Sequence, residues 1–351
     1  MPGRWMSQRL APLCAGLLLV ACADSGQTPL QPEEILTAGA DVNAAATPAA
    51  PTTELLVSGL QALFGSTVGP GRALFVTEPA AGRILRVDPE TGAVTTFASG
   101  LPIGAIGVGG VHDVAFIGRT AYALVSFVTP EAFGGSDVDG LYRVDGPNSF
   151  TLIADIGAFN RANPPATDFF VSTGVSVALE IYQGGFLVSD GHLNRVLRVT
   201  REGEISIFME FDNIVPTGLA LRGRTVYMAQ AGPVPHLPED GKVVAFGPHA
   251  TSATEIASGA PLLVDVEFGR GHTLFALAQG IWDGEFEGSP ALPNTGALVR
   301  ANRQGGFTVV VEELDRPISL EFIGTTAYVA TRAGEIWKIG NVAGPPFGKS
   351  H

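Results

Sequence analysis

The sequence predicts an all-β fold, a six-bladed β-propeller of four-stranded blades, on three observations. First, the 45 Gly, the 25 Pro and a charged fraction of only 16% are typical of a turn-rich β protein. Second, a short alternating segment recurs six times along the chain. Third, each copy lies in a group of strand-like runs that repeats about every 40 to 50 residues, as propeller blades do.

The recurring segment begins at a turn residue and alternates apolar with polar side chains. Its copies are GRILRVD (82–88), GLYRVD (140–145), NRVLRVT (194–200), GKVVAFG (241–247), GALVRAN (296–302) and GEIWKIG (334–340). A run rich in β-branched and aromatic residues precedes every copy, and a mostly apolar run opens five of the six units. Another alternating run follows five copies. Each unit is therefore expected to hold four strands, with the first innermost and the fourth at the rim.

The last unit lacks a fourth strand, because GEIWKIG is followed only by NVAGPPFGKSH. TELLVSGL (53–60) is expected to supply it, since its ending matches the fourth strand TTFASGL (95–101). Pairing of the first strand with the last unit closes the ring and removes an exposed edge. We predict a propeller over 53–342 and a C-terminal tail over 343–351. The alternative is a stray strand on the first blade.

The N-terminal 21 residues are typical of a secretory signal peptide, with positive charges followed by an apolar run too short to span a bilayer. LVAC, ending at Cys22, resembles the lipobox of bacterial lipoproteins. Cys22 would be the one thiol left after cleavage, and lipidation would explain it. Residues 22–52 are expected to form a disordered Ala/Pro/Thr-rich tether. The lipoprotein resemblance implies the outer membrane of the cell envelope, because Ala23 is not the Asp that retains lipoproteins in the inner membrane.

The net charge argues against nucleic acid as a partner. The formal charge is −13, and removal of residues 1–21, which carry two Arg and no acid, leaves −15 (−13 − 2). The sequence contains no run of Lys and Arg, and the binding of a polyanion such as nucleic acid requires clustered cationic side chains. The expected partners are the membrane, through the lipid anchor, and a small molecule or protein. The propeller is expected to be monomeric.

Long loops are predicted on one face of the ring, the face where chains enter the innermost strands and pass from second to third strands. These connections span residues 127–139, 231–240 and 280–295, and the entry to the third blade is also long. Long loops on a rigid scaffold commonly carry binding residues. This face is therefore the predicted working surface.

Polar side chains at the starts of the innermost strands are expected to surround the mouth of the central channel. They are His112, Asp113, Ser176, Thr217, Asp265, Glu267, Ser319 and Glu321. The four carboxylates make the mouth acidic, which suits a cation, an amine or a hydroxylated ligand, so a divalent cation is a candidate cofactor. The alternative is that these groups bind only channel water and backbone ends.

Individual catalytic signals are sparse. His112 and Asp113 are the candidates for a general base, although neighbours in a strand point to opposite faces and both cannot line the channel. His192, His236 and Trp282 are candidate ligand-binding residues in loops of the same face, with ordinary packing or exposure as the alternative. The sequence contains no phosphate-binding loop, no G-x-S-x-G motif and no cysteine pair for zinc.

The segments 73–102, 109–126 and 215–221, together with the run from VDVEFG to FTVVVEEL, resemble the ScyD/ScyE family. This resemblance covers nearly all of residues 53–340 and implies a six-bladed propeller without a settled chemistry. The chain is more distantly similar to NHL and gluconolactonase-type propellers. Those lactonases bind a divalent metal through Glu, Asn and Asp, but here the first-blade entry has no Glu. Thr217 replaces the Asn in PTGL, and Asp265 is one candidate for the Asp.

We therefore expect an exported, lipid-anchored propeller that acts as a binding or scaffold module for a ligand or protein on its loop-rich face. The alternative is a propeller enzyme acting on a small hydroxylated substrate at the channel mouth. Such an enzyme would be a hydrolase or lyase, or a quinoprotein-like sugar oxidoreductase, with His112 or Asp113 as the base to test. Propellers host both kinds of function.

Overall fold

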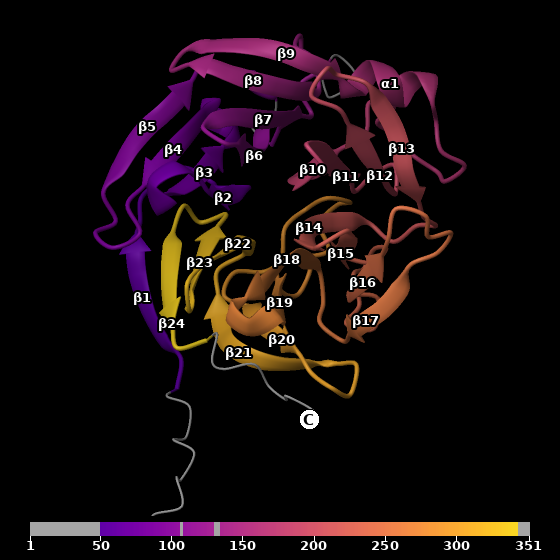
Figure 1. The fold of residues 1–351 in the computed structure, drawn as a ribbon. Coiled ribbons are helices and arrows are strands. Elements are labelled where there is room, and N and C mark those ends of the chain that lie inside the picture. The colour runs from indigo at the N-terminus through magenta and orange to yellow at the C-terminus, as the bar shows by residue number, and fades with distance from the viewer. Residues whose placement is uncertain (1–49, 106–107, 130–133, 343–351) are drawn as a thin grey trace, which may run out of the picture. The chain divides into compact units, whose positions relative to one another are not determined.

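The computed structural model describes residues 50–105, 108–129 and 134–342. They form six four-stranded antiparallel sheets arranged in a ring, which confirms the predicted six-bladed β-propeller (Figure 1). The expected signal peptide, Cys22, most of the expected tether and the C-terminal tail lie outside the described residues. Across the described ranges, no helix is long and apolar enough to cross a membrane.

The blades follow one another along the chain, and within each of the first five the strands run in sequence order from the centre to the rim. Blade 1 holds β2 (Ser66–Val68), β3 (Leu74–Glu78), β4 (Arg83–Val87) and β5 (Val94–Ser99), and blade 2 holds β6 (Gly110–Ile117), β7 (Thr120–Ser126), β8 (Gly140–Gly146) and β9 (Ser149–Asp155). Blade 3 holds β10 (Ser176–Tyr182), β11 (Gly185–Asp190), β12 (Arg195–Val199) and β13 (Ile205–Glu210), and blade 4 holds β14 (Pro216–Arg222), β15 (Thr225–Gln230), β16 (Lys242–Phe246) and β17 (Thr254–Ser258). Blade 5 holds β18 (Leu263–Gly269), β19 (Thr273–Ala278), β20 (Gly296–Ala301) and β21 (Phe307–Leu314).

Blade 6 closes the ring with both ends of the folded chain. It holds β22 (Pro317–Ile323), β23 (Thr326–Thr331) and β24 (Ile336–Gly340), and its outermost strand is β1 (Thr52–Val57). β1 runs antiparallel to β24, with Thr52 opposite Gly340 and Val57 opposite Ile336. Figure 1 shows indigo β1 beside yellow β24. The N-terminal strand therefore completes the last blade, as the sequence predicts.

Neighbouring blades pack against each other through apolar side chains, because the strands alternate and each sheet buries both of its faces. Aromatic pairs join successive blades at ring-centroid distances of 4.6 to 4.9 Å: Phe75 with Phe116, Tyr122 with Phe186, Tyr227 with Phe268, and Phe275 with Phe322. Such pairs contribute roughly 0.5–1.5 kcal/mol each beyond their buried area. The core is therefore divided among the spaces between blades.

Helices are few and short in the described residues. The predicted long loop that enters blade 3 begins with α1 (Ile156–Ala162), and three single-turn 3₁₀ helices are η1 (Pro70–Arg72), η2 (Pro79–Ala81) and η3 (Arg270–His272). The carboxylate of Asp155 caps α1 by accepting a hydrogen bond from the Ala158 N–H at 2.7 Å. This cap explains why a segment with two prolines downstream still opens with a helical turn.

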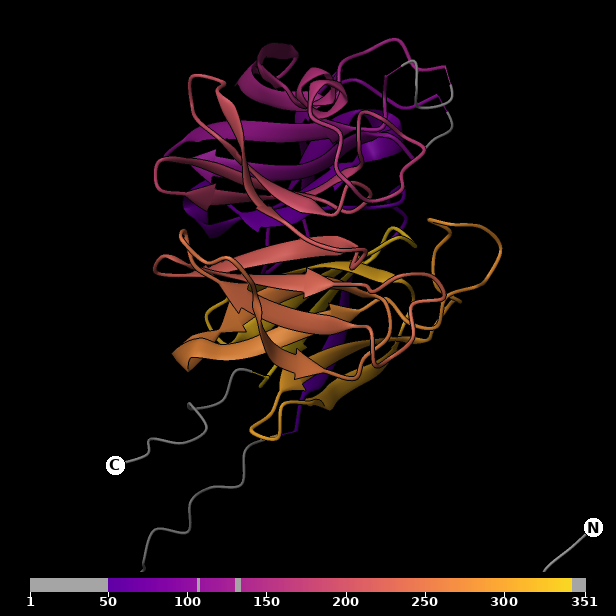
Figure 2. The same ribbon diagram turned by 90° about the vertical axis from the view of Figure 1, so that its right-hand side faces the viewer.

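The ring has two unlike faces. The loop face carries the connections that enter innermost strands and those from second to third strands; the turn face carries the short turns from first to second and from third to fourth strands. In Figure 2 the long connection between β19 and β20 projects to the right, away from the short turns on the left. Thr52 lies at the turn face, because it pairs with Gly340 at the end of a third strand.

The innermost strands are irregular where they start at the loop face. In five of the six, the register with the second strand shifts within the first four residues. A bulge at this point turns side chains out of strict alternation and twists the strand. The residues just before three of these strands also have positive φ: Val215 at 54°, Leu262 at 47° and Arg316 at 48°. Such strain is common beside functional sites.

Candidate functional site

Two aspartates line the channel at the loop-face end and join neighbouring blades. Asp113 of β6 accepts the N–H groups of Val114 at 2.8 Å and of Leu179, in blade 3, at 2.7 Å. Asp265 of β18 accepts from its own neighbour Val266 at 2.8 Å and from Leu320, in blade 6, at 2.7 Å. Backbone donors therefore occupy part of the acceptor capacity of both carboxylates.

Three glutamates line the same channel: Glu180 of β10, Glu267 of β18 and Glu321 of β22. Glu267 and Glu321 follow Asp265 and Ser319 by two residues, so they lie on the same face of their strands, one step further into the ring. Glu267 accepts the N–H of Phe268 at 2.8 Å. Among the hydrogen bonds of the described residues, none engages the Glu321 carboxyl, so this group faces the cavity open to a ligand or proton.

The five carboxyl groups hold their protons more tightly than free carboxylic acids. Burial raises the pKa of Asp265 from 3.8 to about 7 and that of Glu267 from 4.5 to about 8. Burial also raises the pKa values of Asp113 and Glu180 well above their ordinary range, and the neighbouring carboxylates reinforce the effect.

The pKa of Glu321 is raised well above 4.5, first by burial and then by the charges of Glu267 and Asp265. None of the ion pairs among the described residues involves any of the five acids. No described basic group therefore offsets their mutual repulsion, and part of the cluster stays protonated at neutral pH. Groups of this kind in a cavity are candidates for proton transfer.

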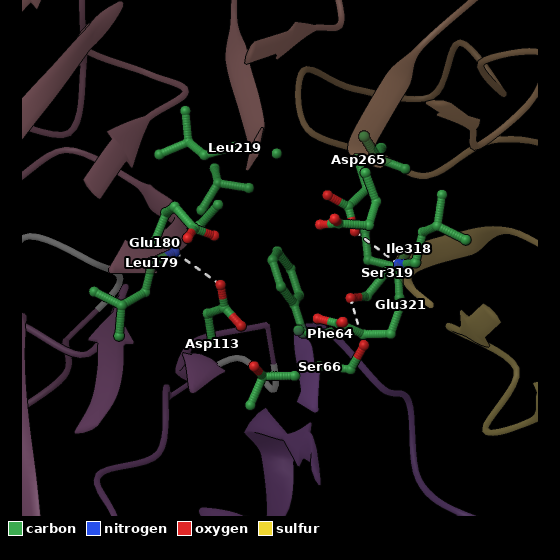
Figure 3. Close-up of a pocket in the computed structure, with 18 of the residues that line it drawn as sticks. Phe64, Ser66, Asp113, Leu179, Glu180, Leu219, Asp265, Ile318, Ser319 and Glu321 are labelled. Carbon is green, nitrogen blue, oxygen red and sulfur yellow. Dashed lines mark hydrogen bonds between the residues drawn. The ribbon is translucent and has the colours of Figure 1, made fainter. Parts of the chain in front are cut away.

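The cavity between these side chains is small. It has a volume of about 60 Å³, room for a few water molecules or a small polar group but not for a sugar ring. In Figure 3 the ring of Phe64 stands among Asp113 of blade 2 and Ser319 and Glu321 of blade 6. Ser66 and Ser319, from blades 1 and 6, share a hydrogen bond of 2.7 Å at the same wall. Any larger ligand must therefore lie on the loop face and extend only one group inward.

His112 does not line this cavity. Its ring is 2% exposed and stacks on Phe64 with the centroids 4.2 Å apart. Nδ1 lies 2.8 Å from the Ser176 carbonyl and Nε2 lies 3.1 Å from the Val108 carbonyl. With a backbone acceptor at each nitrogen, neither is directed at the cavity, and burial lowers the pKa of the ring. Of this adjacent pair, only Asp113 lines the channel cavity, so the placement of His112 at the channel mouth is corrected.

Thr217 and Ser176 are held within the scaffold. The Thr217 hydroxyl lies 3.0 Å from the carbonyl of Ala229 and 2.9 Å from that of Leu263, so its single proton serves backbone acceptors. Ser176 contributes its backbone, since its N–H donates to the Ser126 hydroxyl at 2.9 Å and its carbonyl faces His112. Neither residue lines the channel cavity.

The lactonase-type metal arrangement does not fit these residues. Thr217, which replaces the Asn ligand, points its hydroxyl at two carbonyls, and the described ranges contain no group of three His, Cys, Asp or Glu side chains that could hold a metal ion. The lactonase ligand set is therefore incomplete among the described residues.

The three candidate loop residues organise the loop face. His192 Nε2 accepts the N–H groups of Phe170 at 3.0 Å and Val171 at 3.2 Å, which orders the entry to blade 3. His236 Nδ1 lies 2.7 Å from the Gly232 carbonyl, and its ring meets Trp282 edge-on at 5.8 Å. These contacts tie the long loops of blades 4 and 5 together, outside the channel cavity.

Exposed apolar side chains also gather on the loop face. Of the fourteen large hydrophobic side chains exposed among the described residues, nine lie in its connections: Ile103, Val108, Phe169, Phe170, Val234, Leu237, Ile281, Phe286 and Leu292. The other five lie on outermost strands. Phe170 and Phe286 are 64% and 63% exposed. These side chains make the loop face a candidate binding surface.

Sequence reasoning missed Glu180 and Phe64. Glu180 had a detectable signal, because VALEI, VDVEF and ISLEF align Glu180 with Glu267 and Glu321. Phe64 precedes the innermost strand of blade 1, which has only three residues and no apolar run to mark it. The position of the ring in the channel depends on contacts with other blades, which a single sequence does not display.

Comparison with solved structures places the chain among six-bladed β-propellers. A gluconolactonase from Xanthomonas campestris is 12% identical, with a TM-score of 0.57 over 82% of this chain and 89% of that one. Virginiamycin B lyase from Staphylococcus aureus is 14% identical, with a TM-score of 0.51 over 83% and 98%. A PQQ-bound aldose sugar dehydrogenase from Streptomyces coelicolor is 13% identical, with a TM-score of 0.57 over 84% and 99%.

These likenesses show the fold alone, which is that of a β-propeller. No family model matches the sequence. No curated protein matches it either.

Proposed function

We propose that this protein is a propeller enzyme, a hydrolase or lyase, that acts on a small hydroxylated molecule bound on the loop face. One observation carries the proposal: five buried carboxyl groups meet in the channel without a cationic partner among the described residues, and the pKa values of Asp265 and Glu267 are raised to about 7 and about 8. A protonated carboxyl donates to a leaving oxygen, and its ionised form accepts a proton from a carbon or a water.

Glu321 is the proposed acid–base group. It faces the cavity, it has no hydrogen-bond partner among the described residues, and the charges of Glu267 and Asp265 favour its protonated form. Asp113 and Asp265 accept two backbone hydrogen bonds each, and we propose that they hold in place the strands that form the wall of the cavity. The similar solved structures include a lactonase, a lyase and a sugar dehydrogenase, which supports an enzyme more than a scaffold.

Turnover by the purified protein tests this proposal. The substrates are D-glucono-1,5-lactone, followed with a pH indicator, a streptogramin B, followed by mass spectrometry, and aldoses with PQQ and a dye acceptor. We expect turnover of the lactone or the streptogramin, and a drop in kcat of about a hundredfold or more in Glu321→Gln. Glu202→Gln, on an exposed turn, is the matched control. Absence of turnover with both the lactone and the streptogramin, or full activity of Glu321→Gln, would refute the proposal.

The second candidate function is the binding module expected from the sequence, and the exposed apolar side chains of the loop face favour it. In that case the double variant Phe170→Ser/Phe286→Ser loses ligand or partner binding, while Glu321→Gln keeps it. We also propose that the protein is a member of the ScyD/ScyE family, and that it is exported and anchored by a lipid on Cys22. These proposals rest on sequence resemblance alone.

A further inference from the structure

Cationic side chains gather on the turn face of blades 4 and 5. We call them the basic turn patch: Arg222, Arg224, His249, Arg270, His272, Arg300 and Arg303. They lie in, or at the strand ends beside, the turns β14–β15, β16–β17, β18–β19 and β20–β21. All are exposed except the half-buried Arg300. These residues are spread over about eighty positions of sequence, so only the fold brings them to one surface.

The patch contains no acid in its turns. Residues 222–225 read RGRT, 247–253 read GPHATSA, 269–273 read GRGHT and 301–306 read ANRQGG. The long loop-face connections of the same two blades contain Glu239, Asp240, Asp283, Glu285 and Glu287. The two blades are therefore basic on one face and acidic on the other, within a chain of net charge −13. Such polarity orients a protein in front of a charged surface.

The basic turn patch also contains an open hollow. An open hollow of about 540 Å³ lies between the two turns of blade 5, lined by residues 271–274 and 300–304. His272, Arg300 and Arg303 are its cationic lining. Guanidinium groups bind phosphate oxygens in pairs and retain their charge at any physiological pH, so this lining suits a phosphate group.

The chain enters the propeller on this same face. Thr52 pairs with Gly340 at the turn-face end of blade 6, next to blade 5 in the ring. Twenty-nine residues, 23–51, separate Thr52 from Cys22, and a tether of that length, as expected from the sequence, would span about 30 Å on average. A lipid on Cys22 would therefore hold the turn face within reach of the membrane that carries the anchor.

We infer that the basic turn patch docks the propeller onto an anionic phospholipid surface, with headgroup phosphates seated at the hollow of blade 5. Docking in this orientation leaves the acidic, apolar loop face directed away from the membrane. The inference is independent of the proposed catalysis, and its test removes the lipid anchor so that the two contributions separate.

The test measures vesicle binding by the chain without residues 1–22, which retains every described residue and hence the closed ring. The vesicles are phosphatidylcholine with or without phosphatidylglycerol, and binding is followed by co-sedimentation. We expect binding only to the anionic vesicles, weakening as salt rises. The triple variant Arg222→Ser/Arg224→Ser/Arg270→Ser should bind about a hundredfold more weakly. Lys242→Ser/Arg161→Ser/Arg316→Ser removes the same charge from the loop-face side and should bind as the parent does.

Three results would overturn the inference. The unacylated protein could ignore anionic vesicles at low salt, or the two triple variants could lose binding equally, which would reduce the effect to net charge. Binding of a DNA duplex without vesicle binding would instead assign the patch to nucleic acid. Thermal melts of both variants confirm that the fold is retained.

Discussion

Asp113 and Asp265 occupy the same position in blades 2 and 5, and each fastens its blade to the next through a 2.7 Å hydrogen bond, to Leu179 and Leu320 respectively. The residue facing each aspartate in the preceding blade is a glycine. A Cβ on Gly65 would collide with the Asp113 carboxylate, and a Cβ on Gly218 would collide with that of Asp265. The same pairing of a bridging aspartate with a glycine of the preceding blade therefore occurs twice, three blades apart.

Gly218→Ala and Gly65→Ala should each destabilise the protein by about 2 kcal/mol, because the added methyl displaces a buried carboxylate that bridges two blades. Guanidinium unfolding curves measure the loss. Gly247→Ala is the control, since Gly247 has no neighbour within reach of a Cβ and no positive φ. Equal stabilities for the three variants would show that the bridging aspartates do not depend on the glycines.

Stability should fall as pH rises from about 4 to about 8. The folded pKa values of Asp265 and Glu267, about 7 and about 8, exceed their ordinary values of 3.8 and 4.5, so the folded state binds more protons than the unfolded state across this window. The protonated Asp265 and Glu267 contribute their full stabilisation at pH values below the pKa values of the unfolded state. This contribution is lost as the pH rises through the pKa values of the folded state. The melting temperature should drop by roughly 5 °C between these limits.

Glu267→Gln/Glu321→Gln should reduce this pH dependence, because two of the titrating groups are gone. Glu202→Gln should preserve it. Differential scanning fluorimetry at a series of pH values makes the comparison. A melting temperature that is flat with pH, or a slope unchanged in the double variant, would contradict the raised pKa values.

Deletion of Thr52–Val57 should lower the melting temperature by roughly 10 °C or more, because it removes the outermost strand of blade 6 and exposes the edge of β24. Glu54→Ser keeps the backbone pairing and changes only an exposed side chain, so it should melt as the parent does. A deletion variant with an unchanged melt would show that the ring is stable without its closing strand.

Arg195→Met should destabilise the protein by about 3 kcal/mol. Arg195 is fully buried, donates to the Asn163 carbonyl at 2.7 Å and to Asn160 Oδ1 at 2.8 Å, and thereby fixes the segment after α1 that carries Phe169 and Phe170. Arg201→Met removes an exposed arginine from the same blade and should be nearly neutral. Urea unfolding of the two variants measures the difference in stability. Similar unfolding midpoints would show that the buried hydrogen bonds of Arg195 do not stabilise the fold.

Cys22→Ser should abolish palmitate labelling and release the protein from the membrane fraction at high salt, because the expected lipid acceptor is gone and salt screens the basic turn patch. Metabolic labelling and fractionation of the producing cells measure both effects. Continued labelling of the Cys22→Ser protein would refute lipidation at this residue. Labelling that is lost while membrane association persists at low salt would point to the basic turn patch as a second attachment.

The repeat pattern by itself determined the blade count, the four strands of each blade and the closing role of residues 53–60. These are consequences of strand periodicity and turn spacing, which a chain displays along its own length. Periodicity also placed Asp113, Asp265, Glu267 and Glu321 on innermost strands, and hence in the channel.

Only the tertiary structure decided which polar groups meet and how they are occupied. It directed the nitrogens of His112 to backbone carbonyls, placed Phe64 among the carboxyls, added Glu180 to them and gathered arginines from blades 4 and 5 on one face. The physical reason is that hydrogen bonding, burial and charge clustering depend on distances between blades. Those distances join residues far apart in the chain, and no local pattern encodes them.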